Sequence, residues 1–255
     1  MRAWVARGLA AAIVAGALAA TAAPADAQQT GFQSVRFTSQ KRPVRVDVFT
    51  ARGAGRKAAV IVLHGAHGIG RGELIYPQAK ALAERGINAF VVHYFDGLNA
   101  STRRAAETSV EMAFARDRVI EDAITFVSGR PDVDPKRIGL YGLSLGAYHA
   151  VGLAGRDRRI AAVVSMVGAF PGHVQRDALG RLPPILILHG DNDRQVPLEK
   201  AFDMAMLFDR LGAAYDMKVY ARQGHSFTSP AKENSVNVAS DFFVKQLSDP
   251  HKPAS

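Results

Sequence analysis

The sequence contains no cysteine, and this absence excludes several kinds of chemistry. Without a thiol the chain cannot form a disulfide or attack a substrate through a cysteine nucleophile. It also cannot hold a metal ion or an iron–sulfur cluster through thiolates. Any nucleophile must therefore come from another residue type.

Apolar runs of membrane length are absent beyond the N-terminus, whose composition differs from that of the rest. Arg2 and Arg7 precede an Ala-rich apolar run over residues 8–23, and Ala25-Asp26-Ala27 follows it. A basic start, a short apolar stretch and a cleavage site of small residues are typical of a cleavable signal peptide. The alternative is a membrane anchor, but the run is short for one and rich in Ala rather than Leu. We predict that residues 1–27 are a signal peptide and that the mature chain, from Gln28, is periplasmic or secreted, with no stable membrane insertion.

Charge of one sign is only moderately in excess. The formal net charge is +9, but the Arg and Lys residues are scattered, and no motif combines them with aromatic residues. We therefore expect no nucleic-acid partner. The chain also has no internal repeat and no linker long enough to divide it, so residues 28–255 are predicted to form a single domain.

What is present is an alternation of short apolar strands and amphipathic helices. Strands separated by helices imply parallel crossovers, with helices covering both faces of the sheet. The predicted fold class is therefore α/β, with a mostly parallel central sheet, and ligands should bind beyond the carboxyl ends of its strands. Strands are expected over residues 44–49, 58–63, 88–95, 137–141, 160–167, 184–188 and 215–220, and helices over 76–85, 110–128, 145–153, 198–211 and 235–247.

A G-x-S-x-G motif, Gly142-Leu143-Ser144-Leu145-Gly146, stands between a predicted strand and a predicted helix. A serine on such a tight turn has strained backbone angles, and side chains at the flanking positions would collide with their surroundings. The turn lifts the hydroxyl clear of the sheet, and the helix N-terminus adds a positive end beside a developing oxyanion. The context predicts Ser144 as a nucleophile.

A serine nucleophile needs a histidine base and a carboxylate that orients the histidine. Two aspartates follow the strand ending at Leu188. Asp191 is placed to cap the turn, whereas Asp193 lies further out on the loop and is the predicted acid. His225 follows a later strand and is the predicted base. The order Ser144, Asp193, His225 is nucleophile, acid, base along the chain, the order that accompanies this serine motif.

An oxyanion hole needs two backbone N–H groups directed at one point. One is expected from Leu145, directly after the nucleophile. The other is expected from the loop after Leu63, with Ala66 as first choice and His67 as second. No metal or cofactor is predicted, since His64 and His67 have loose metal-like spacing but no acidic ligands beside them.

The walls of the substrate pocket are harder to predict, because they come from loops. Residues 97–104 are expected to form a polar loop, and the segment 97–112 is a candidate small lid. Large side chains after strands are candidates to line an apolar pocket, although aromatic residues more often belong to the core. The candidate pocket residues are His67, Tyr94, Phe95, Phe170 and Phe227.

With these segments in place, the sequence resembles the dienelactone hydrolase family of α/β-hydrolases over nearly all of the predicted mature chain. The resemblance implies a catalytic triad of Ser144, Asp193 and His225. The residues that carry it are Leu63-His64-Gly65, residues 133–139, Gly142 to Gly146, residues 189–197 and Gly224-His225-Ser226-Phe227.

The chain departs from the namesake enzymes of that family at three places. They use a cysteine nucleophile where this chain has Ser144, and they carry a glutamate in the oxyanion loop, which here is Gly65-Ala66-His67-Gly68. They also hold a substrate carboxylate with arginines, one shortly after the histidine, whereas residues 226–229 include none. These differences weigh against a dienelactone substrate, and the resemblance implies a general esterase instead.

The predicted function is hydrolysis of carboxylic esters or lactones through an acyl-enzyme on Ser144, with a small-molecule substrate as partner. Two alternatives remain. One is a peptidase of the same fold, related to prolyl peptidases, although those usually carry an added domain. The other is a non-catalytic binding protein built on a hydrolase scaffold.

Overall fold

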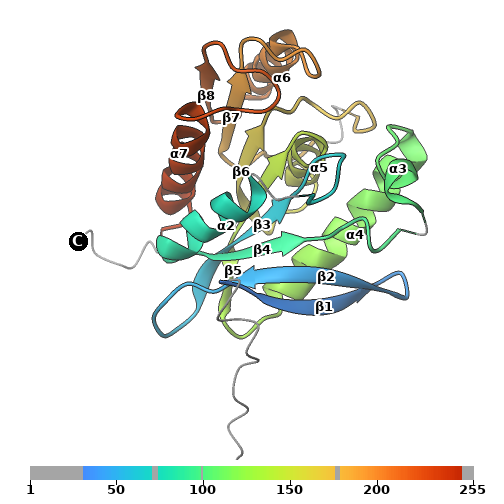
Figure 1. The fold of residues 1–255 in the computed structure, drawn as a ribbon, viewed down its shortest axis with the longest axis vertical. Helices are drawn as coiled ribbons and strands as arrows, with labels where there is room; N and C mark the ends of the chain where they lie inside the picture. The colour runs from blue at the N-terminus through green and yellow to red at the C-terminus, as the bar shows by residue number, and fades with distance from the viewer. Residues whose placement is uncertain (1–30, 71–73, 99, 176–178, 249–255) are drawn as a thin grey trace, which may run out of the picture.

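The computed structural model describes residues 31–70, 74–98, 100–175 and 179–248, and these form one eight-stranded sheet with helices on both sides (Figure 1). The strand order is β1-β2-β4-β3-β5-β6-β7-β8. The β1–β2 and β2–β4 pairs are antiparallel, and all the other pairs are parallel. The predicted α/β fold with a mostly parallel sheet is therefore confirmed.

The strands follow one another along the chain with helical crossovers between most of them. The strands are β1 Gln33–Ser39, β2 Arg42–Phe49, β3 Lys57–Leu63, β4 Asn88–Val92, β5 Val133–Leu143, β6 Ile160–Met166, β7 Ile185–Gly190 and β8 Tyr215–Tyr220. The helices are α2 Ile75–Glu84, α3 Thr102–Ala105, α4 Val110–Ser128, α5 Leu145–Ala154, α6 Leu198–Leu211 and α7 Ala231–Gln246.

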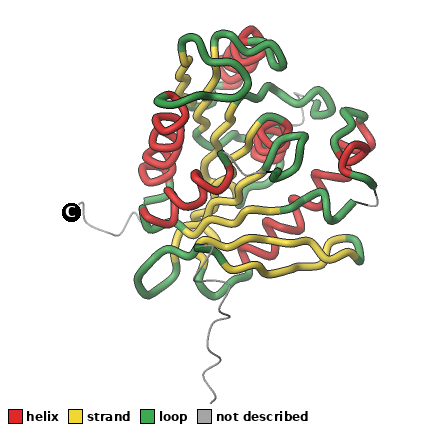
Figure 2. Tube along the Cα trace, in the orientation of Figure 1, coloured by secondary structure: helices red, strands yellow, loops and turns green. Residues whose placement is uncertain are grey.

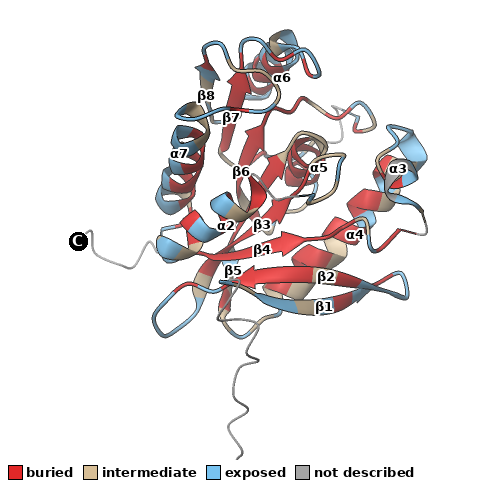
Figure 3. Cartoon of the chain, viewed as in Figure 1, coloured by how far each residue is buried: buried red, intermediate tan, exposed pale blue. Residues whose placement is uncertain are grey.

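The central strands are apolar on both faces because both faces are covered. β3 reads KAAVIVL, and every residue after Lys57 is buried. One apolar cluster joins the sheet to α4, α5 and α6, and a second cluster joins the other face to α2 and α7. Figure 2 shows the strands running between these two groups of helices, and Figure 3 shows buried strands beneath the exposed outer faces of α2 and α7.

Several element bounds differ from the sequence-based prediction. β1 was not predicted, although Val35 and Phe37 alternate with polar residues as in a half-buried strand. The short helix α3 stands where a polar loop was expected over 97–104. β4 ends at Val92 instead of continuing to Phe95, because residues 94–97 turn away from the sheet.

The loops that follow β3, β5, β7 and β8 lie at one edge of the sheet, since these strands are parallel. They contain residues 64–68, Ser144, residues 191–197 and His225 respectively. Segments far apart in the sequence are thereby brought together, as expected for an open α/β sheet. Within the described ranges, none of the helices has the length and apolar character that a membrane span requires.

Candidate active site

Ser144 occupies a strained turn between β5 and α5, with φ 52° and ψ −116°. The two flanking glycines are required by close backbone contacts. A Cβ atom at Gly142 would lie 2.3 Å from the carbonyl oxygen of Gly146, and one at Gly146 would lie 2.5 Å from the carbonyl oxygen of Leu63. Real Cβ atoms do not approach backbone atoms this closely, so the turn depends on glycine at both positions.

The structure brings Ser144, His225 and Asp193 into one chain of hydrogen bonds. The Ser144 Oγ lies 2.8 Å from the His225 Nε2, and the His225 Nδ1 lies 2.8 Å from the Asp193 Oδ2. The Asp193 side chain is fully buried, and that of His225 is 15% exposed. This geometry suits a serine whose proton passes to a histidine held in one tautomer by a carboxylate.

The other oxygen of Asp193 is fixed by its own loop. The Oδ1 atom accepts hydrogen bonds from the backbone N–H groups of Gln195 and Val196, each at 2.9 Å. His189 ties down the same loop, because its Nε2–H donates to the Val196 carbonyl at 2.8 Å. These contacts aim the Oδ2 atom at His225, so the carboxylate is positioned before any substrate binds.

Asp191, the alternative acid, does not take part in the hydrogen bonds that join Ser144, His225 and Asp193. Its carboxylate accepts a 2.6 Å hydrogen bond from the backbone N–H of Arg222. Its own N–H donates to the Tyr220 carbonyl at 3.1 Å. Asp191 therefore joins the loops that follow β7 and β8, and so fixes the relative position of the loops that carry Asp193 and His225.

The loop after β3 passes directly beside the serine. A Cβ atom at Gly65 would lie 3.4 Å from the Ser144 Cβ. The carbonyl of Gly65 accepts hydrogen bonds from the His64 Nδ1 at 2.8 Å and from the Gly68 N–H at 3.1 Å. Because the C=O and N–H of a trans peptide point in opposite directions, these bonds turn the Ala66 N–H away from His64. Ala66 and Leu145 both line the cavity that contains Ser144.

His64 is buried and stacks on Tyr94, with ring centroids 4.1 Å apart. Burial lowers the pKa of His64 to about 4, with small further contributions from nearby histidines, while the bond to Gly65 opposes the shift. The imidazole is therefore neutral at physiological pH and carries its proton on Nδ1, where it can donate to Gly65.

Two cavities meet at the serine, and Ser144, His225, Gln195 and Ala66 line both. The first has a volume of about 400 Å³, and the second has a volume of about 300 Å³. A carbonyl carbon above Ser144 could therefore direct one substituent into each cavity. The first cavity is also lined by Ala106, Thr108, Val110, Ala113, Arg116, Leu145, Tyr148, His149, Pro171, Gly172, His173 and Val196.

The candidate pocket residues divide into two groups. His67 and Phe227 line the second cavity. Tyr94, Phe95 and Phe170 are not among the described residues that line either cavity: Tyr94 is buried in the core, and the other two pack against it. The Tyr94 hydroxyl instead donates to the His64 carbonyl at 2.8 Å. This hydrogen bond joins the loop after β3 to the core.

Sequence reasoning missed most of the first cavity, above all Arg116, Tyr148 and Gln195. Gln195 stands two residues after the predicted acid, and this position was a usable signal that it lines the site. For Arg116 the signal was its position on the apolar face of α4, between Ala113 and Ile120, where a charged residue is unexpected without a partner.

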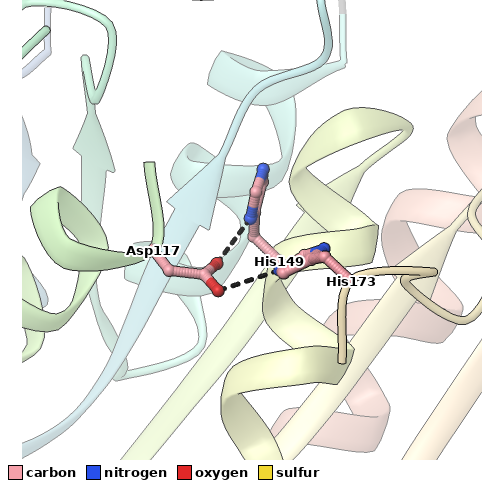
Figure 4. A group of neighbouring side chains, drawn as sticks. All are labelled: Asp117, His149 and His173. Carbon is pink, nitrogen blue, oxygen red and sulfur yellow. Dashed lines mark hydrogen bonds and ion pairs between the residues drawn. The ribbon is translucent and has the colours of Figure 1, made fainter. Parts of the chain in front are cut away.

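Asp117, His149 and His173 form a cluster beside the first cavity (Figure 4), and their ligand-type atoms lie within 4.8 Å of one another. These atoms already have protein partners. The Asp117 Oδ1 accepts from the His149 Nδ1 at 2.6 Å, and its Oδ2 accepts from the His173 Nε2 at 3.0 Å and from the Arg156 Nη2 at 2.6 Å. Since Arg116 donates to the other nitrogen of His149, a metal would have to displace an arginine on each side of the cluster, so the residues do not fit a metal.

The sequence pattern of the dienelactone hydrolase family matches residues 44–246. Thiohydrolase apmlB of Arthrinium phaeospermum is 38% identical over 101 residues, which cover 38% of this chain and 30% of that protein. The chain thus spans about a third of the length of this curated relative.

Solved structures share the fold at low sequence identity. A dienelactone hydrolase-like promiscuous phosphotriesterase from metagenomic libraries superposes with a TM-score of 0.74 at 17% identity, covering 84% of this chain and 98% of that chain. The acylaminoacyl peptidase of Pyrococcus horikoshii superposes with a TM-score of 0.69 at 14% identity, covering 88% of this chain and 43% of that chain.

Proposed function

The chain belongs to the dienelactone hydrolase family, and from this premise we propose that it is a serine hydrolase that cleaves carboxylic esters or lactones through an acyl-enzyme on Ser144. The observation that carries the proposal is the hydrogen-bond chain from Ser144 through His225 to Asp193. A serine without a base at this distance is a weak nucleophile. The serine, its base and the acid come from loops after three different strands, so their contact is a property of the whole fold.

The proposed reaction gives each of these residues a defined part. The His225 Nε2 takes the Ser144 proton as the Oγ attacks the carbonyl carbon, and Asp193 stabilises the imidazolium that forms. The N–H groups of Leu145 and Ala66 donate to the oxyanion of the tetrahedral intermediate. His225 then gives its proton to the departing alcohol oxygen, which leaves the acyl group on Ser144. His225 then takes a proton from a water molecule as that water attacks the acyl carbon, and it returns the proton to the Ser144 Oγ as the carboxylic acid leaves.

The test compares purified wild-type protein with Ser144→Ala on a series of p-nitrophenyl esters of increasing acyl length. We expect the variant to lose at least about three orders of magnitude in kcat/KM. Ser128→Ala, at the far end of α4 from the site, is the matched control and should keep wild-type activity. Wild-type esterase activity in Ser144→Ala would overturn the proposal.

Two further substrate panels separate the alternatives. Dipeptide amides test for a peptidase, whose fold this chain shares with the acylaminoacyl peptidase. Thioesters belong beside the oxygen esters because a curated relative is a thiohydrolase. A fluorophosphonate probe that fails to label Ser144 would favour a non-catalytic binding protein instead.

A further inference from the structure

The first cavity is enclosed by two walls that do not belong to the sheet. One wall is the segment from the end of α3 to the first residue of α4, which contributes Ala106, Thr108 and Val110. The other is the loop after β6, which contributes Pro171, Gly172 and His173. Ala106, Thr108 and Gly172 supply little apolar contact of their own, so the walls need another source of rigidity.

Arg116 supplies that rigidity for the first wall. Its side chain projects from α4, and the residue is only 1% exposed. The Nη1 atom donates to the carbonyl oxygens of Ala105 at 2.7 Å and Glu107 at 2.8 Å, on either side of Ala106. Hydrogen bonds from a charged donor are among the stronger contacts in a folded chain. The backbone of the wall is therefore held to α4 by a single guanidinium.

The guanidinium is itself held by a buried relay. Its Nε atom donates to the His149 Nε2 at 2.8 Å, and the His149 Nδ1 donates to Asp117 at 2.6 Å. Burial lowers the pKa of His149, although Asp117 opposes this shift. The ring is therefore neutral, with its proton on Nδ1. The charge of Asp117 is balanced by Arg156 at 2.6 Å. In this arrangement each partner fixes the orientation of the next.

Asp117 also holds the second wall. Its Oδ2 atom accepts from the His173 Nε2 at 3.0 Å, and Figure 4 shows the carboxylate facing both imidazoles, with a dashed line to each. The His173 ring meets the Phe114 ring of α4 edge-on, with centroids 5.3 Å apart. One carboxylate on α4 thus fixes the spacing between the two walls.

We propose that Arg116 and His173 are positioning residues that set the width of the first cavity, and so determine the size of the substrate group that reaches Ser144. The proposal rests on the proposed ester hydrolysis and specifies its selectivity. The Nε and Nη1 donors of Arg116 bind an imidazole and two carbonyls of the protein, which is the pattern of an anchor.

The test compares Arg116→Lys with wild-type protein and with Arg118→Lys, which changes an exposed arginine on the same helix. Lysine keeps the charge but offers one nitrogen, which cannot reach Ala105, Glu107 and His149 together. We expect the ratio of kcat/KM for decanoyl over acetyl p-nitrophenyl ester to rise by at least about tenfold in Arg116→Lys, mainly through a lower KM for the long ester. Arg118→Lys should keep the wild-type ratio.

His173→Leu loosens the second wall and provides a second variant if Arg116→Lys fails to fold. It should shift the ratio in the same direction. Amide hydrogen exchange gives a readout that does not depend on activity: residues 105–109 should exchange faster in Arg116→Lys than in Arg118→Lys. Unchanged exchange and an unchanged ratio in folded variants would overturn the inference.

Two other outcomes are distinguishable. If the change in Arg116→Lys is confined to half-esters that carry a free carboxylate, Arg116 contacts the substrate directly and the anchoring role is wrong. If wild-type protein neither hydrolyses an ester nor reacts with a fluorophosphonate, the proposed function fails, and the exchange measurement alone decides whether Arg116 anchors the wall.

Discussion

At the scale of single residues, the site depends on side chains whose ionisation state is fixed by burial. His64 is the clearest example, because it is 1% exposed and is the first residue of the loop that carries Ala66. Its Nδ1–H bond to the Gly65 carbonyl requires a particular tautomer. Burial keeps the ring neutral, although the imidazolium would keep the same Nδ1–H donor.

This burial predicts a pH dependence of stability. The pKa of His64 falls from an ordinary value of 6.5 to about 4 on folding. As the pH falls below 6.5, the unfolded chain takes up a proton that the folded chain resists, so the free energy of unfolding should decrease until about pH 4 and then level off. The total contribution is on the order of 3 kcal/mol.

The measurement is urea unfolding of wild-type protein and His64→Asn between pH 7 and pH 4. The variant should show the smaller loss of stability over this interval, since asparagine does not titrate. His67→Asn, which changes an exposed neighbour, is the matched control and should follow the wild-type curve. Parallel curves for wild type and His64→Asn would show that His64 is not the source of the dependence.

The three residues of the hydrogen-bond chain could be selected from sequence, because two of them belong to short local patterns. The glycines around Ser144 and the distance of Asp193 from its strand are local features, and chain order selects His225. The pocket could not be predicted in the same way. Arg116 reaches the cavity only because α4 packs beside α5 and places it against His149, which lies 33 residues away in the sequence.

At the scale of elements, glycine also permits close packing between α7 and the sheet. A Cβ atom at Gly139 on β5 would lie 2.6 Å from the Cε1 atom of Phe243. Phe243 is fully buried, so its ring occupies the space that the missing side chain leaves. This contact seats α7 on the strand that leads to Ser144.

Removing this ring should destabilise the fold strongly. Phe243→Ala is expected to lower the free energy of unfolding by about 3–5 kcal/mol, because the cavity cannot refill from the rigid strand below. Val244→Ala, one residue further on α7 and 40% exposed, is the matched control and should cost only about 0.5 kcal/mol. Urea denaturation of both variants measures the difference, and equal losses would contradict the packing argument.

Long periodic elements were predicted well, and short ones were not. The bounds of α4 and α6 match the prediction because apolar spacing and breakers define both ends, and the short strand β8 is an exception whose bounds match as well. α3 has only four residues and no apolar stripe of its own, so its sequence gives no period to detect. Its position depends on the Arg116 bonds to Ala105 and Glu107, which arise only in the folded protein.

At the scale of the whole molecule, the loops that carry Ser144, Asp193 and His225 belong to a sheet whose two faces are buried by separate apolar clusters. The described chain therefore supports the site without disulfides, as the absence of cysteine requires. A fold of this kind is compatible with export, where an oxidising environment would have no thiol to modify. The family pattern begins at residue 44, well after the proposed leader.

We propose that residues 1–27 are removed during export, because Arg2 and Arg7, the Ala-rich run and Ala25-Asp26-Ala27 have the order of a signal peptide. Expression of the full chain in a Gram-negative host should yield periplasmic protein with Gln28 as its N-terminal residue, as read by N-terminal sequencing. Replacing both Ala25 and Ala27 by Leu should block cleavage and leave the longer chain bound to the membrane, since the cleavage site requires small residues. Ala20→Leu, which keeps the run apolar, is the matched control and should be processed normally. Recovery of the uncleaved wild-type chain in the cytoplasmic fraction would refute the proposal.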